Sequence, residues 1–183
     1  MSATHDRAAL PQRHAAGAET PVFAALSVLV AVVVGLSGCG REQASGAAIA
    51  IAAAAIGDAA CAACGMVVGE QPSPRGQVVY RDGSHSHACS LSDLAHVAVA
   101  PSPLGNPVAT FVEVQDAAVD PVAPDTAPQP WHPADSVFFV AGVARRGVMG
   151  PPLLAFAAEA TARAAATRLG GEVRSWADVI KDR

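Results

Sequence analysis

An apolar run without a charged residue, residues 21–36 (PVFAALSVLVAVVVGL), limits how much of this 183-residue chain can form a folded domain. The run is shorter than the roughly 20 residues that a transmembrane helix needs. Arg7 and Arg13 precede it, which suits the hydrophobic region of an export signal, although Glu19 makes the preceding charge less uniform. We therefore expect the fold to be formed by the residues that follow this run.

The run ends in Leu36-Ser37-Gly38-Cys39, which resembles the lipobox of bacterial lipoproteins. In that motif the cysteine is acylated and becomes the first residue of the mature chain; the alternative is an ordinary cleavage site with an incidental cysteine. The resemblance implies a signal peptide over residues 1–38 and a lipid anchor at Cys39, on the periplasmic side of the cell envelope. Gly40 stands where an aspartate would favour the inner membrane, so we expect the outer membrane if the cell is Gram-negative.

The charge composition of the chain limits the classes of partner that we expect it to bind. It has 12 Lys and Arg against 16 Asp and Glu, a net charge of -4, and no basic run, so nucleic acid is not an expected partner. Residues 39–60 are rich in Gly and Ala, and their apolar patch at residues 47–57 is too short to span a bilayer. We predict a flexible tether over residues 39–60.

The motif with the largest number of potential metal ligands or redox-active groups in a short stretch is Cys61-Ala62-Ala63-Cys64-Gly65-Met66. Two thiols three positions apart can bind one soft ion or oxidise to a disulfide, whereas the thioether of Met66 serves only the ion. If residues 64–68 form a strand, Cys64 and Met66 lie on one face of it. Thiolate and thioether together favour Cu(I) over harder ions. Cysteines that stay reduced outside the cytoplasm need a reason, and a bound metal is one.

A second group of potential ligands follows at residues 84–89 (SHSHAC). If this segment is extended, His85, His87 and Cys89 share one face. Such an alternation is found in metal half-sites and equally in solvated edge strands, and the sequence leaves both interpretations open.

The order of predicted elements is strand, strand, helix, strand in each half of the domain. In residues 61–116 we expect strands at 64–68 and 77–80, a turn at Asp82-Gly83, a helix capped by Ser90 and Asp93 that stops at Pro101, and a strand at 109–114. In residues 135–183 we expect a strand at 136–140, a turn at 145–147 followed by residues 148–152, a helix at 157–169, a strand at 172–176 and a short helix at 177–181, and we assign no residue range to the second strand of this unit. A Pro-rich linker, residues 117–134, joins the two units. The predicted fold class is α+β, with two antiparallel sheets that are each covered by a helix.

Several motifs together resemble the NosL family, the copper-binding accessory lipoproteins of nitrous oxide reductase maturation. They are the lipobox, CAACGM, VVYRDG, WHPADSVFFV, VMGPP and LGGEVRSWADVI, in this order along the chain. The resemblance implies two consecutive ββαβ units similar to part of organomercurial lyase. It implies a protein that is not an enzyme, and that binds Cu(I) and delivers it to the apo-reductase or its maturation machinery. Cys61, Cys64, Met66 and Met149 match the metal-binding pattern.

This chain departs from the family pattern in its Pro-rich insert and in HSHACS, where an aromatic residue is more usual near Ala88. Three other functions remain open at this point. Cys61 and Cys64 could serve a thiol–disulfide oxidoreductase, although such pairs usually begin a helix. Zinc could bind Cys61, Cys64, Cys89 and His87 as a tetrahedral structural site. Organomercurial cleavage has only the analogy of fold in its favour.

Overall fold

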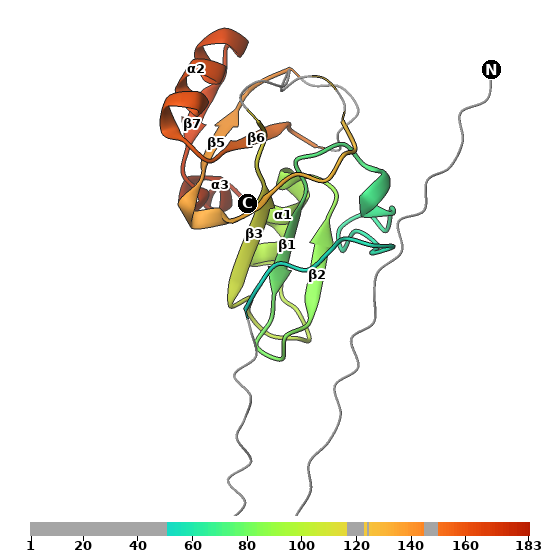
Figure 1. The fold of residues 1–183 in the computed structure, drawn as a ribbon. Helices are drawn as coiled ribbons and strands as arrows, with labels where there is room; N and C mark the ends of the chain where they lie inside the picture. Colours follow the sequence, from blue (N-terminus) through green and yellow to red (C-terminus); the bar gives the residue numbers. More distant parts are fainter. Residues whose placement is uncertain (1–50, 117–122, 124, 145–149) are drawn as a thin grey trace, which may run out of the picture. The chain divides into compact units, whose positions relative to one another are not determined.

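The computed structural model describes residues 51–116, 123, 125–144 and 150–183 (Figure 1). The predicted signal peptide, Cys39, most of the predicted tether and Met149 lie outside these residues. Within the described part of the chain, no helix is long and apolar enough to cross a bilayer.

The first half of the described domain forms a four-stranded antiparallel sheet with the strand order β2-β1-β3-β4. Helix α1 joins β2 to β3 and packs on one face of the sheet (Figure 1). The elements are β1 (Gly76–Val79), β2 (His85–Ala88), α1 (Leu91–Val99), β3 (Ala109–Glu113) and β4 (Trp131–Pro133), preceded by a short 3-10 helix (Val68–Glu70).

The second half forms a three-stranded antiparallel sheet with the order β6-β5-β7. Its elements are a 3-10 turn (Ala134–Ser136), β5 (Phe138–Ala141), β6 (Leu153–Phe156), α2 (Glu159–Leu169), β7 (Glu172–Arg174) and α3 (Trp176–Lys181). In both sheets the first strand of the unit lies between the second and the third. This shared order confirms the α+β class with two consecutive ββαβ units.

The two sheets share a core, and the second sheet is covered on both faces. On one face Phe139, Leu153 and Ala155 pack in the cluster that also contains Leu94 of α1 and Val112 of β3. On its other face, alternate residues of the same strands pack against α2. A backbone hydrogen bond from Gln115 to Ala155 also joins the end of β3 to β6. The units are therefore held together by a continuous apolar core.

Close packing of α1 on the first sheet requires a residue without a side chain at Gly76. A Cβ atom built there would lie 2.3 Å from Cδ2 of Leu94. Since real Cβ atoms do not approach so closely, only glycine at this position lets α1 lie directly on β1. This contact fixes the start of α1 relative to β2, and the candidate site described below lies at that junction.

Local signals predicted the ends of several elements correctly. The hydroxyl of Ser90 accepts a hydrogen bond from the backbone N–H of Asp93 and caps α1, which ends before Pro101. The Asp82-Gly83 turn joins β1 and β2, with Gly83 at φ 82°. Gly170 ends α2 in the left-handed conformation, as a C-cap.

The strand predictions need correction in both units. Residues 64–68 are not a strand, because the chain turns at Cys61–Cys64 and enters the 3-10 helix at Val68. The second strand of the first unit is instead β2, the His-containing segment. Strands β4 and β6 were not predicted. Trp131 lies in β4 and pairs with Glu113 of the first sheet.

Two segments expected to be a tether and a linker contact the domain where they are described. The backbone of Ala54 exchanges two 2.9 Å hydrogen bonds with the side chain of Gln77. The carbonyls of Asp125, Thr126 and Ala127 accept hydrogen bonds from the segment that precedes β1. The predicted boundaries of tether, units and linker otherwise stay predictions.

A buried ion pair connects these segments. Arg75 and Glu113 are 1% and 0% exposed, with Nη2 and Oε1 2.7 Å apart. Oε2 of Glu113 also accepts hydrogen bonds from the N–H and Nε of Arg75, and Oε1 from the N–H of Gln129. The remaining guanidinium hydrogens reach backbone carbonyls, including those of Gly69 and Thr126. Arg75 thereby ties the segment after the cysteine motif to β3 and to residues 125–129.

Candidate metal site

The cysteine motif folds into a small closed loop. The N–H of Cys61 donates to the carbonyl of Met66, and the N–H of Gly65 donates to the carbonyl of Cys61, both at 2.8 Å. Gly65 has φ 77°, a conformation that side chains disfavour, so glycine suits this position. The loop joins the first sheet through a bridge between Cys61 and His87 of β2. The motif is therefore held at the edge of the sheet.

Cys89 and Asp93 approach the loop from the junction of β2 and α1. Cys89 lies between the end of β2 and the N-cap, and Asp93 lies in the first turn of the helix. The carboxylate of Asp93 does not complete a capping box with Ser90. Its Oδ2 accepts a hydrogen bond from Sγ of Cys89 at 3.2 Å instead. The cap of α1 thus orients an acidic group toward a thiol.

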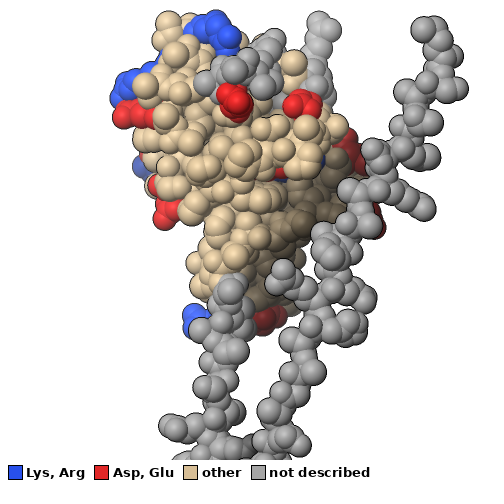
Figure 2. Space-filling view, viewed as in Figure 1, with Lys and Arg blue, Asp and Glu red and all other residues tan. Residues whose placement is uncertain are grey.

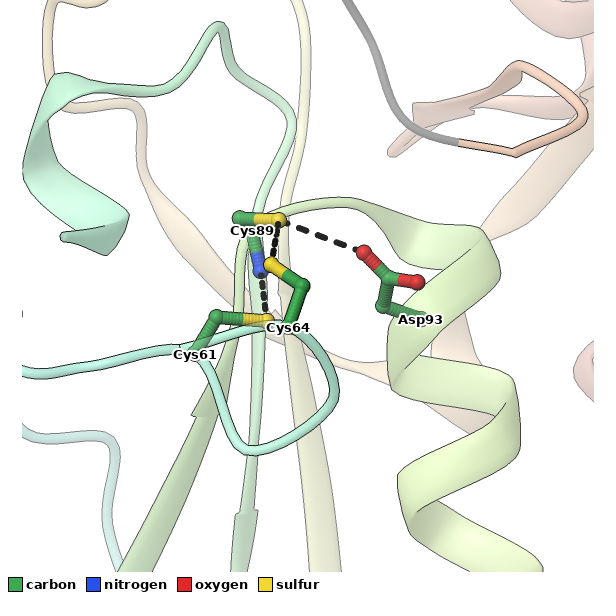
Figure 3. Close-up of side chains that lie close together, drawn as sticks. All are labelled: Cys61, Cys64, Cys89 and Asp93. Carbon is green, nitrogen blue, oxygen red and sulfur yellow. Dashed lines mark hydrogen bonds between the residues drawn. The ribbon is translucent and has the colours of Figure 1, made fainter. Parts of the chain in front are cut away.

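The four side chains converge, as Figure 3 shows. One ligand atom from each of Cys61, Cys64, Cys89 and Asp93 lies within 4.8 Å of all the others. The sulfurs of Cys64 and Cys89 are 3.5 Å apart, and Sγ of Cys61 accepts the N–H of Cys89 at 3.4 Å. All three cysteines are free thiols. Among the described residues this is the group of His, Cys, Asp and Glu side chains that is suited to a metal ion.

The surroundings give the two buried thiols opposite acidities. Burial alone would raise the pKa of Cys61, but the N–H groups of Cys89, Cys64 and Ala63 and the thiol of Cys64 lower it further than burial raises it. Burial raises the pKa of Cys89, and the hydrogen bond to Asp93 raises it again. Since a metal binds the thiolate, Cys61 is the readier ligand, and Cys89 must lose its proton when it binds.

The three thiols also differ in their exposure to solvent. Cys61 and Cys89 are each 3% exposed and pack with Val68, whereas Cys64 is exposed. Ala62 and Ala63 in the same loop are exposed as well. A metal ion or a partner therefore reaches the group from the side of Cys64.

Of the other predicted ligands, Met66 lies near the group and Met149 is outside the described residues. Met66 is half-buried and packs against the cluster of Cys61, Val68 and Cys89. The structure thus brings Cys61 and Cys64 together, with Met66 packed against the cluster that contains Cys61.

The two histidines of β2 do not belong to the group. His85 and His87 stack with their ring centroids 6.2 Å apart, and Nδ1 of His85 lies 2.8 Å from Oε1 of Gln77. His87 is buried, and burial and then the charge of His85 lower its pKa. Its Nε2 has no hydrogen-bond partner among the described residues. The alternation predicted one face for His85, His87 and Cys89, but only Cys89 meets the other thiols.

Asp93 was missed as a potential site residue, because its place three positions after Ser90 explained it fully as a helix cap. The signal that could have identified it is the i,i+4 spacing from Cys89. This spacing puts a residue just before the cap within reach of one in the first turn.

The arrangement suits a soft metal ion. Three sulfurs favour Cu(I) or Zn(II), and a carboxylate oxygen is a ligand that zinc accepts more readily than Cu(I) does. Cys61 and Cys64 do not begin an α-helix, which is the usual position of a redox Cys-x-x-Cys pair. The chemistry that this geometry supports best is metal binding.

The rest of the described surface offers no second group of this kind. On the face in Figure 2, most of the surface belongs to residues other than Lys, Arg, Asp and Glu. A pocket of about 640 Å³ lies above the Arg75–Glu113 pair, and no cysteine lines it. Its lining is mainly apolar residues of the segment 53–57 and of β4 and the chain before it.

Comparisons with known proteins agree with this description. The sequence profile of the NosL family matches residues 53–183. The "Copper-binding lipoprotein NosL" of Stutzerimonas stutzeri is 29% identical over 156 residues, which cover 84% of this chain and 77% of that protein. The crystal structure of the copper chaperone NosL from Shewanella denitrificans superimposes with a TM-score of 0.60 at 24% identity. It covers 72% of this chain and 98% of its own, so the two share a fold. Because the profile match spans most of the chain and all of the folded domain, this protein belongs to the NosL family.

Proposed function

We propose that this protein is an extracytoplasmic lipoprotein, not an enzyme, that binds Cu(I) and delivers it for assembly of the copper centre of nitrous oxide reductase. The observation that carries the proposal is the convergence of three free thiols on one point at the end of β2. Soft sulfur ligands select Cu(I), and the low coordination number of Cu(I) lets a partner's ligand enter. The printed names of the relatives, a copper-binding lipoprotein and a copper chaperone, support this function.

The ligands that we propose are Cys61 and Cys64, with Met66 and Met149 as thioether donors and Cys89 as a third thiol within reach of the same ion. Cys61, buried and with a lowered pKa, holds the ion. Cys64 is exposed and is the ligand that a partner's sulfur or imidazole replaces during transfer. The transfer is thus a ligand exchange in which the ion keeps a bond to the protein until the partner has made one.

Met149 is proposed on the family motif and on the position of its neighbour. Gly150, the next residue, lies close to Ser92, since a Cβ atom built on Gly150 would be 3.4 Å from Oγ of Ser92. Ser92 precedes Asp93 in the first turn of α1. This contact brings the chain after Met149 next to the helix turn that carries Asp93, which supports a thioether contribution from the second unit.

Anaerobic titration of the reduced protein with Cu(I) and, separately, with Zn(II) tests the proposal. We expect one Cu(I) to bind tightly and Cys64→Ser to abolish that binding with the fold intact. Ala63→Ser is the matched control, because it adds the same hydroxyl to an exposed position of the same loop. A Cys64→Ser protein that binds Cu(I) as well as the Ala63→Ser protein would move the site elsewhere.

Zinc is the second candidate, because three thiols and the carboxylate of Asp93 lie within tetrahedral reach of one ion. The zinc arm of the titration separates the two functions. If Zn(II) binds tightly and Asp93→Asn weakens it while Cu(I) binding is weak, the protein is a zinc protein.

The lipid anchor has its own test. If Cys39 is acylated, Cys39→Ala leaves the precursor uncleaved or releases the protein from the membrane fraction. A variant with the normal mass and the normal membrane fractionation would refute the anchor.

A further inference from the structure

Two of the three thiols are placed to react with each other. The sulfurs of Cys64 and Cys89 are 3.5 Å apart although the residues are 25 positions apart in the chain. A disulfide has a sulfur–sulfur distance of about 2.05 Å, so the two atoms need to close by about 1.5 Å. This distance is small enough for a side-chain rotation to cover.

The loop favours this pair over the neighbouring pair in the motif. Cys64 lies in a turn and is itself exposed, so its side chain can rotate without displacing buried atoms. Sγ of Cys61 is buried and accepts the N–H of Cys89. A Cys61–Cys64 disulfide would have to draw Sγ of Cys61 away from that N–H inside the core. A Cys64–Cys89 disulfide leaves this contact in place and removes instead the hydrogen bond from the thiol of Cys89 to the half-buried carboxylate of Asp93.

We propose that Cys64 and Cys89 form a disulfide when the protein is metal-free in an oxidising compartment, and that this disulfide excludes Cu(I). The proposal rests on the proposed function for the compartment and for the identity of the ion. The disulfide is a reversible covalent modification: the reduced site binds copper and the oxidised site does not.

The reaction is a thiol–disulfide exchange with a small-molecule or protein disulfide as the oxidant. Cys64, as its thiolate, attacks one sulfur of the oxidant, whose other sulfur leaves as a thiolate. The thiol of Cys89 then passes its proton to solvent through the carboxylate of Asp93, which accepts its hydrogen bond, and attacks Sγ of Cys64, which releases the second thiolate. The protein loses two hydrogens as protons and two electrons, and the oxidant takes up those electrons and becomes two thiols.

The consequence for metal binding follows from which sulfurs remain. The disulfide uses the exposed ligand through which an ion enters and one of the two buried thiols. Only Cys61 then keeps a thiol in the group, with Met66 beside it. Conversely, a copper ion bound to Cys64 prevents the attack of this thiolate on the oxidant. Loading with copper therefore protects Cys64 and Cys89 from oxidation.

The experiment uses the full chain in detergent, treated anaerobically with excess oxidised glutathione. Free thiols are then alkylated, and the disulfides of the monomer are mapped by mass spectrometry without reduction. We expect a Cys64–Cys89 cross-link with Cys61 alkylated, at least tenfold weaker Cu(I) binding, and full recovery of binding after reduction. Protein loaded with Cu(I) beforehand should form the cross-link at least tenfold more slowly.

Two outcomes overturn the proposal: a cross-link between Cys61 and Cys64, or a stable mixed disulfide of Cys64 with glutathione. Cys61→Ser is the informative variant, since it keeps the reacting pair and must still form the cross-link. If the reduced protein does not bind Cu(I) while the Cys64–Cys89 cross-link forms as expected, the proposed function fails and the disulfide stands. The two hypotheses are therefore tested separately.

Discussion

Replacement of Glu113 by Gln tests how much of the stability depends on the buried ion pair. The carboxylate accepts four hydrogen bonds, three from Arg75 and one from Gln129, and it is fully buried. Glutamine offers one oxygen and turns an NH₂ group toward these donors. The guanidinium of Arg75 then keeps its charge in the interior without a counter-charge.

Breaking a buried ion pair on one side costs about 3–5 kcal/mol. Domains of this kind are stable by only about 5–15 kcal/mol, so Glu113→Gln should remove a large share of the free energy of unfolding. The same substitution at Glu159 is the matched control. Glu159 pairs with Arg163 on the surface of α2, where the two side chains are 49% and 69% exposed and such a pair contributes about 0.5 kcal/mol or less.

Urea unfolding of the two variants and the parent, followed by circular dichroism, gives the comparison. A double variant, Arg75→Met with Glu113→Leu, should be more stable than Glu113→Gln, because no unpaired charge remains. The reasoning is refuted if Glu113→Gln and Glu159→Gln differ by less than about 0.5 kcal/mol.

Three further predictions concern the ligands and the packing. Met149→Leu keeps the volume of an apolar side chain, so stability should change by less than about 1.5 kcal/mol while Cu(I) affinity falls; lost stability with unchanged affinity in titration would assign Met149 to the core. Folding lowers the pKa of His87 from 6.5, so below pH 6.5 the unfolded chain binds a proton at this residue more readily than the folded chain does. The free energy of unfolding should therefore decrease as the pH falls below 6.5. Urea unfolding of His87→Phe should show a weaker decrease over the same range, and an identical decrease would contradict the assignment. Gly76→Ala forces a methyl group into Leu94 and should cost about 1–3 kcal/mol in the same assay, and a neutral effect would mean that α1 can shift outward.

The ends of helices and the turns that depend on one or two neighbouring residues were predictable from the sequence. Ser90 and Gly170 end their helices as their chemistry requires, and Asp82-Gly83 makes the expected turn. The order of elements also predicted the duplication, since both halves give the same strand order. These features depend on neighbours in the chain, which a sequence displays directly.

The features that were missed depend on distant contacts. The segment 153–156 is buried on both faces and lacks the alternation that identifies a half-buried strand. Residues 64–68 carry sulfur atoms at alternate positions, but the hydrogen bond from Cys61 to the carbonyl of Met66 closes the segment into a loop. Cys89, which the zinc alternative had grouped with Cys61 and Cys64, reaches them because β2 pairs beside the loop, and Asp93 stands where that alternative had His87.

The cysteine loop also shields the chain from unwanted pairing with other copies of itself. Strand β2 is an outer strand of the first sheet, and outer strands present backbone groups that other chains can pair with. The loop occupies part of that edge, because the N–H of Ala62 donates to the carbonyl of His87 at 2.8 Å. Substitutions that unfold the loop should therefore cause concentration-dependent aggregation through β2. The solubility of loop variants then reports on the integrity of the metal site even where no copper is present.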